Sequence, residues 1–313
     1  MAGDGPTVAR LELGDRLRRL RAAARIDGAT AAAALRASVS KISRMESGQV
    51  PVRARDVTDL LALYGGCDET ERAALLGLAK RSGEPGWWDE FSDTLTASTR
   101  HHLSLESETS QIWTYDPQAI PALLQTDEYA RAVSTGGLDG TAWRGGQGAD
   151  VLARRRGVLD QPGPPRIWAL IQEAALYRAP AGDREILRAQ LAALRAAGTL
   201  PHITVHIVPD GAASVLAAAG PFSLLRFAPP NVADVVLLEL LTTLRCAERR
   251  TDVDCHSQLF NMLATDAVAP QDTLEVLDDL ARETTGSPPP GGGGTGRKSL
   301  HERIQVIHAS REQ

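Results

Sequence analysis

The chain has 313 residues, a length that predicts about two domains. Hydrophobic residues make up 43% and charged residues 23%, which is ordinary for a globular protein. Its net charge of −5 excludes a polybasic nucleic-acid coat, and its three widely spaced cysteines exclude a disulfide-framework fold and fit a reducing cytoplasm. Because no apolar run approaches about 18 residues and the first ten residues lack a hydrophobic signal core, we expect neither a membrane-spanning nor a secreted protein.

Charge is distributed unevenly along the chain. Residues 11–55 contain ten Lys and Arg but four Asp and Glu, whereas the remainder is acidic. A basic segment on an acidic body is typical of a module that approaches phosphate, although a solvated basic helix face has the same composition. Charge alone leaves both interpretations open.

The first part of the chain predicts an all-α domain over residues 10–81. The expected helices cover residues 11–25, 30–35, 39–46, 56–64 and 69–81. The third helix begins after Ser38, a good N-cap, and ends at Gly48, with Val39, Ile42 and Met45 expected on its inner side. A helix, a tight turn and a short helix form a helix-turn-helix layout.

The sequence of residues 38–48, SVSKISRMESG, resembles the recognition-helix signature of Cro/lambda-repressor-type regulators, the xenobiotic-response-element family. Residues 13–21 resemble the first helix of that head, and the resemblance covers residues 11–66. It implies a domain that binds an operator in double-stranded DNA. The chemistry agrees, because serines and a lysine in the first turn, with Arg44 one turn later, offer donors to the major groove.

The resemblance also implies roles for single residues. Those expected to face base edges are Val39, Ser40 and Arg44, and those expected near the DNA backbone are Ser38, Lys41 and Ser43. Arg21 and Glu46 would form an internal ion pair that holds the first helix against the third, a structural role. Three departures weaken the case for tight, base-specific binding: Gly28 replaces a polar residue that usually contacts phosphate, Arg36 replaces the usual turn glycine, and Val39 offers only an apolar contact, such as one to a thymine methyl group.

Residues 82–284 predict an α+β domain with a small mixed sheet covered by helices. The expected strands cover 166–172, 202–208, 222–227 and 235–241, and the expected helices cover 105–113, 183–197, 255–264 and 273–282. Three residues are candidate ligand or partner contacts, namely Glu173 at the end of the first strand and the adjacent Trp87 and Trp88. For all three, a structural role is the competing interpretation, and for the tryptophans the core is favoured.

A second resemblance covers residues 85–283. Trp87-Trp88, Leu105-Glu106 and residues 121–131 (PALLQTDEYAR) resemble the conserved domain that follows the repressor head in many actinobacterial regulators, although Ala122 replaces a glycine. Those regulators are often described as antitoxin-like and paired with a small partner protein encoded nearby. The resemblance therefore implies such a partner.

The sequence offers little support for catalysis, a cofactor or a metal. His202 and His206 share a strand face but lie about 13 Å apart along it, too far for one ion. Cys255-His256 has no second ligand pair, and no nucleophile elbow occurs. An active site would be indicated by a deep cleft that gathers Glu173 with a histidine, and nothing in the sequence pattern requires one. We therefore expect no enzyme.

Residues 285–313 are expected to form a flexible linker and a tail peptide. The run of three prolines and four glycines is typical of a linker, and its likeness to a phosphate-binding loop is superficial because no strand precedes it. Residues 300–309 can form a short amphipathic helix. A docking peptide and a cloning remnant both remain open.

These patterns predict a cytoplasmic, sequence-specific DNA-binding transcriptional regulator. Since one head of this size contacts about one half-site, we expect a homodimer. The alternative is a non-enzymatic, antitoxin-like adaptor whose DNA-binding head is degenerate.

Overall fold

A computed structural model describes residues 7–134, 148–211, 220–240, 244–283 and 299–311. The chain folds into two compact units. The first comprises Met1–Thr109 and Phe227–Asp234, and the second comprises Ser110–Arg226 and Val235–Gln313. The first unit therefore contains the segment 82–109 in addition to the five predicted helices. Most of the predicted linker, residues 284–298, lies outside the described residues.

The first unit is helical, as predicted. Its elements are α1 (Thr7–Ala23), α2 (Gly28–Ala34), α3 (Val39–Glu46), α4 (Ala54–Tyr64), α5 (Glu69–Ser82), the short 3-10 helix η1 (Trp87–Phe91) and α6 (Ala97–Ser107). Side chains of Asp27, Ser38 and Asp68 accept backbone N–H groups at the starts of α2, α3 and α5. These caps satisfy N–H groups that have no partner inside a helix, which is why the helices begin there.

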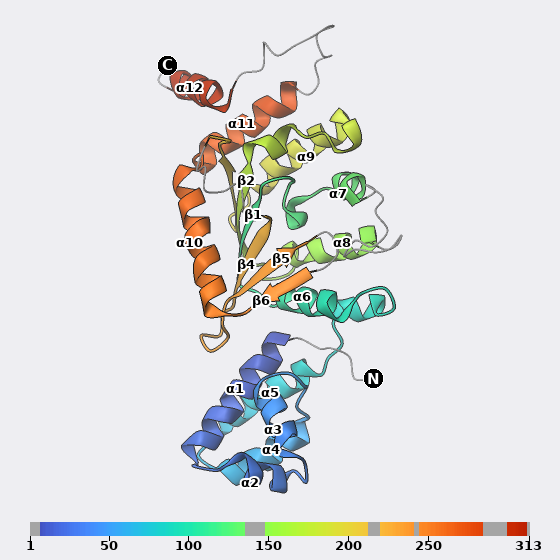
Figure 1. Ribbon diagram of the computed structural model, residues 1–313, viewed down its shortest axis with the longest axis vertical. Coiled ribbons are helices and arrows are strands. Elements are labelled where there is room, and N and C mark those ends of the chain that lie inside the picture. The colour runs from blue at the N-terminus through green and yellow to red at the C-terminus, as the bar shows by residue number, and fades with distance from the viewer. Residues whose placement is uncertain (1–6, 135–147, 212–219, 241–243, 284–298, 312–313) are drawn as a thin grey trace. The chain divides into compact units, whose positions relative to one another are not determined.

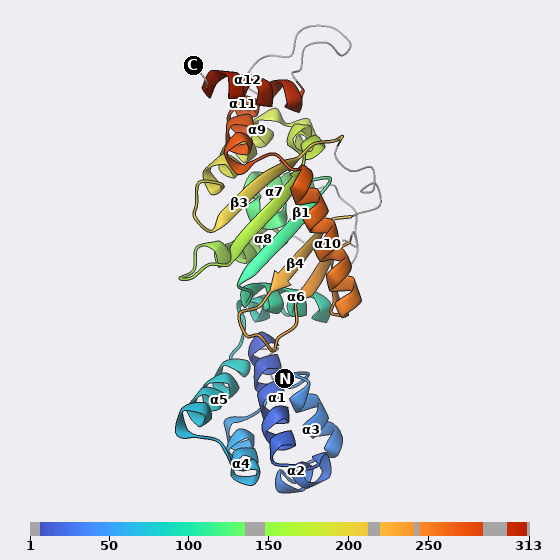
Figure 2. The ribbon, with the colours of Figure 1, turned by 90° about the vertical axis from the view of Figure 1, so that its left-hand side faces the viewer.

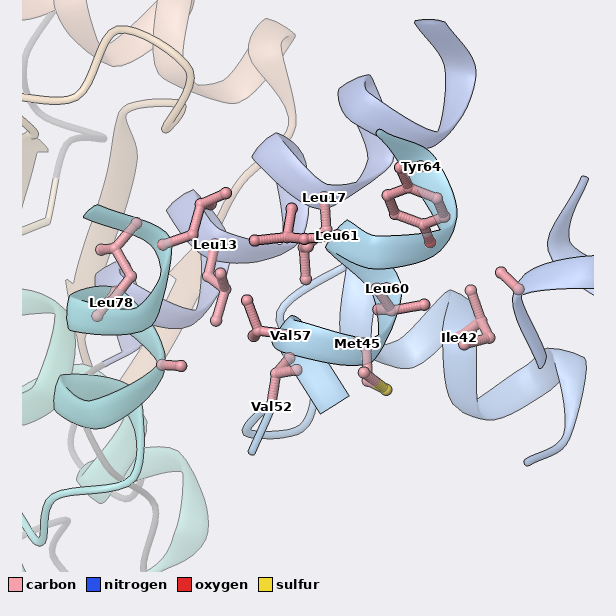
Figure 3. Packing of buried hydrophobic residues seen from close by; sticks show 14 of the residues in the cluster. Leu13, Leu17, Ile42, Met45, Val52, Val57, Leu60, Leu61, Tyr64 and Leu78 are labelled. Atoms are coloured by element: carbon pink, nitrogen blue, oxygen red, sulfur yellow. The ribbon is translucent and has the colours of Figure 1, made fainter. Parts of the chain in front are cut away.

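The helices of this unit close around one apolar core (Figure 3). Leu13 and Leu17 of α1 are fully buried, and Ile42 and Met45 of α3 are nearly so. Because apolar residues recur in α1 and α3 at spacings of three and four, each helix presents one stripe to this core. The opposite face of α3 is left to solvent.

The second unit contains a six-stranded mixed sheet. Its strands are β1 (Gln111–Asp116), β2 (Arg166–Gln172), β3 (Ile203–Val208), β4 (Phe222–Arg226), β5 (Val235–Glu239) and β6 (Leu244–Ala247). They lie in the order β3-β2-β1-β4-β5-β6. Strands β1, β2 and β3 are parallel, whereas β4 is antiparallel to β1 and to β5, and β5 is antiparallel to β6. The predicted mixed sheet is confirmed.

Helices cover both faces of this sheet. The helices of this unit are α7 (Asp127–Ser134), α8 (Gly148–Arg156), α9 (Arg184–Ala197), α10 (Arg250–Asp266), α11 (Pro270–Glu283) and α12 (Leu300–Arg311), with short 3-10 turns η2 (Ala122–Leu124), η3 (Gly157–Leu159), η4 (Glu173–Tyr177) and η5 (Pro180–Gly182). Helix α10 lies on one face, and α7, α8 and α9 lie on the other (Figures 1 and 2). Helix α11 packs against α9 and β3.

The predicted helix over residues 105–113 is wrong. Helix α6 ends at Ser107, and residues 111–116 form β1, which pairs with β2 on one side and β4 on the other. The Trp113 ring stacks on Phe260 of α10, 5.1 Å between centroids, and Arg226 lies 3.7 Å above the same ring. The strand is stabilised by these distant partners, which a local pattern does not show.

Candidate nucleic-acid interface

The outward face of α3 is built from small polar side chains and one arginine. Ser40, Ser43 and Arg44 are exposed, whereas Ile42 and Met45 are buried. Val39 was expected on the inner side, but this residue is 54% exposed. It stands at the first position of the helix, where its Cγ1 faces the start of α2 near Gly28, beyond the edge of the core.

The turn before α3 keeps the helix-turn-helix shape although its usual glycine is missing. Arg36 adopts a φ of 51°, the left-handed region that glycine occupies without strain. Two residues later Ser38 is extended, and its Oγ accepts the N–H of Lys41 at 3.2 Å. The hydroxyl of Ser38 therefore caps the helix and keeps its hydrogen available for a phosphate.

Lys41 does not point freely to solvent. Its Nζ lies 3.2 Å from Oδ2 of Asp56 in the first turn of α4, and its side chain is 41% exposed. Asp56 was not singled out from the sequence, because it lies 15 residues away on another helix. Part of the charge expected at the DNA backbone is therefore balanced within the protein.

Apart from Arg21, the other cations of the basic segment, residues 11–55, fall into two groups. Arg16, Arg18 and Arg19 of α1 each pair with Glu12 or Asp15 of the same helix, and Arg55 pairs with Asp59 within α4. Within this segment, all of which the structure describes, four exposed arginines have no ion pair: Arg25, Arg36, Arg44 and Arg53. The Nε of Arg44 only approaches the Ser40 carbonyl oxygen at 3.4 Å. These guanidinium groups carry the uncompensated positive charge of the segment.

Arg21 and Glu46 hold α1 against α3. Arg21 donates from Nε to Oε1 of Glu46 at 2.6 Å and from Nη2 to Oε2 at 2.8 Å, and its Nη1 reaches the Ile26 carbonyl at 2.9 Å. The hydrogen bonds to Glu46 raise the pKa of Arg21. Gly14 lies at the same seam, where an added Cβ would stand 2.5 Å from the Met45 carbonyl oxygen. The position of α3 thus depends on a paired charge and on a close backbone approach.

Glu108 caps the N-terminal end of α1. Its two carboxylate oxygens accept the N–H groups of Val8 and Ala9 at 2.8 and 3.1 Å. Burial raises the pKa of Glu108 to about 7, although those two hydrogen bonds act in the opposite direction. No local signal identifies this residue, because it lies about 100 positions from the helix it caps.

The candidate ligand contacts have partners within their own units. In the first unit Trp88 is 2% exposed, and Trp87 donates from Nε1 to the Ser107 hydroxyl at 3.2 Å. In the second unit Glu173 begins η4, and its Oε2 accepts the N–H of Asp210 at 3.1 Å. All three residues lie outside α3, the helix that forms the candidate nucleic-acid interface.

The described residues contain no group of three or more His, Cys, Asp and Glu side chains that could hold a metal ion. Nδ1 of His206 lies 2.8 Å from the Val268 carbonyl oxygen, and burial lowers the pKa of this histidine. In the same described part of the chain, no helix combines the length and the apolar character needed to cross a membrane.

Two families match the chain. Residues 12–75 match a helix-turn-helix domain, the fold of DNA-binding regulators, and residues 99–279 match a domain of unknown function, DUF5753. Neither the curated proteins nor the solved structures give a match. Since the second match spans more than half of the chain, this protein belongs to the DUF5753 family and carries a helix-turn-helix domain in front of that region.

Proposed function

We propose that the protein is a sequence-specific DNA-binding transcriptional regulator that lays α3 in the major groove of its operator. The observation that carries this proposal is the division of α3 into a buried stripe, Ile42 and Met45, and an exposed polar face. The buried stripe and the Arg21–Glu46 pair fix the helix, so the exposed face is presented without a conformational cost.

The exposed side chains fit the two kinds of contact that DNA offers. We assign Arg44 to a base edge, since an unpaired guanidinium can bind guanine with two hydrogen bonds, and we assign Val39 to a thymine methyl group. Ser40 also faces the bases, while Ser38 and Ser43 lie toward the phosphates. Lys41 contacts phosphate only in competition with Asp56.

Several features of the proposal rest on the family resemblance described above. We propose a homodimer, because one recognition helix reads about half of a two-fold operator. We also propose an actinobacterial, Cro-like regulator that acts in the cytoplasm with an antitoxin-like second domain and a small partner protein encoded nearby. The proposal gives the protein no catalytic role and no cofactor.

The proposal is tested by fluorescence anisotropy with duplexes from the promoter of its own gene and with a scrambled duplex, each at two salt concentrations. Arg44→Ala should weaken binding to the operator by about 1–3 kcal/mol and relax its sequence preference. Arg72→Ala, which removes an exposed arginine from α5, is the matched control and should leave the preference unchanged. An equal loss on operator and scrambled DNA would make Arg44 a phosphate contact instead.

The adaptor alternative is favoured by two observations. Lys41 is engaged by Asp56, and Gly28 supplies no side chain to contact phosphate at the start of α2. An adaptor with a degenerate head should bind no duplex even at low salt, where nonspecific binding by a basic domain is strongest. Saturable binding to the operator excludes this alternative.

A further inference from the structure

The tail helix α12 lies against α11 (Figures 1 and 2). A small set of its side chains is buried. Leu300 and Ile307 are 4% and 6% exposed, and between them the side chain of Arg303 is fully buried. These three residues lie on one face of the helix because they are spaced by three and four positions. A charged side chain at the centre of an apolar contact requires a dedicated partner.

Glu283, the last residue of α11, is that partner. Nη1 and Nη2 of Arg303 donate to its two carboxylate oxygens at 2.9 and 2.6 Å, a two-point arrangement that fixes the angle of the guanidinium. Burial by itself lowers the pKa of Arg303, but hydrogen bonds to Glu283 and Tyr177 raise it overall. The contact is therefore specific for arginine, because only a planar guanidinium group can donate two parallel hydrogen bonds to one carboxylate.

The covalent connection does not force α12 into this place. Helices that follow one another in bundles are usually joined by about 2–8 residues. Here residues 284–298, with three prolines and four glycines in succession, separate α11 from Ser299. A chain of about 15 residues can extend to roughly 50 Å, far more than the contact between Glu283 and Arg303 needs. The position of α12 therefore depends on its side-chain contacts, among them the three buried residues, and not on the length of the connection.

We infer that the end of α11 is a helix-binding site, which α12 of the same chain occupies as a tethered and reversible ligand. The site recognises an amphipathic helix with an arginine, an apolar residue three positions before it and another four positions after it. Tethering supplies an effective concentration of about millimolar, so a contact this small stays formed although its intrinsic affinity is low. This inference does not depend on DNA binding.

The test uses the full chain with a protease recognition sequence placed among the linker glycines and a fluorophore at the C-terminus. After cleavage, the labelled tail should remain bound at high protein concentration, leave on about hundredfold dilution, and bind again when the sample is concentrated. Arg303→Met should weaken this rebinding at least tenfold. Gln305→Ala is the control and should leave it unchanged, because Gln305 is exposed and contacts His301 of the same helix.

Two results would overturn the inference. If the cleaved tail leaves only together with unfolding of the second unit, α12 is an integral part of the fold. If the Arg303→Met tail rebinds as well as the original one, Glu283 does not select an arginine. Thermal unfolding of each cleaved sample, measured in parallel, distinguishes loss of the site from loss of the fold.

Discussion

Gly14→Ala tests whether close backbone contact between α1 and α3 holds the recognition helix. A Cβ at this position would stand 2.5 Å from the carbonyl oxygen of Met45 and 2.7 Å from that of Glu46. Both atoms belong to the backbone of α3 and cannot move like the end of a side chain. Since ordinary contacts begin at 3.4 Å, α1 and α3 must separate by about 1 Å to accept the methyl group.

The expected magnitude follows from two opposing effects. Alanine is favoured over glycine inside a helix by about 0.5–1 kcal/mol, whereas overpacking a closed core costs about 1–3 kcal/mol. Gly77→Ala in α5 provides the control, because a Cβ there meets nothing within 4 Å. The helix preference is common to both variants, so the difference between their free energies of unfolding isolates the clash at about 1–3 kcal/mol.

The assay must report on the first unit by itself, because a chain with two units need not unfold in one step. Hydrogen exchange of the α1 and α3 amides, followed by mass spectrometry, gives the local free energy of opening. Gly14→Ala should speed exchange in both helices, and Gly77→Ala should slow it or leave it unchanged. Equal protection in the two variants would refute the proposed seam.

The remaining predictions concern charges. The pKa of Glu108 is about 7 when folded against an ordinary 4.5, so its stabilising effect is complete below about pH 4.5 and is lost as the pH rises through 7. Glu108→Gln should remove up to roughly 3 kcal/mol of that pH dependence from the local opening free energy of the α1 amides, measured by hydrogen exchange at several pH values. Identical pH profiles for the variant and the original protein would contradict this. Asp56→Asn releases Lys41 and should tighten duplex binding several-fold at low salt. The slope of the logarithm of the binding constant against the logarithm of the salt concentration should steepen by about one. An unchanged slope would show that Lys41 contacts no phosphate.

Local patterns predicted most of the elements. The structure gives α3 and β2 the limits expected from the sequence, residues 39–46 and 166–172. An N-cap serine, a closing glycine and a short, nearly continuous apolar run act within a few positions, so their effect can be read without the fold. The sequence also favoured a core position for Trp87 and Trp88, and Trp88 is 2% exposed.

Interactions across long sequence separations were beyond such patterns. Residues 111–113 were expected to be helical, yet they belong to the central strand β1, because β2 and β4 supply its hydrogen bonds. The engagement of Lys41 by Asp56 was missed for a similar reason, since periodicity indicates which side of a helix is polar but not which charge lies opposite.

The amino-acid order by itself determined the helix-turn-helix segment, the α+β character of the second domain and the charge contrast between residues 11–55 and the rest of the chain. Only the tertiary structure decided that Glu108 caps α1 and that Arg303 is buried on Glu283. Caps, turns and amphipathic stripes are set by neighbours in the chain. The pairing of a charge is set by whichever residue the fold brings within about 3 Å, and that residue can lie anywhere in the sequence.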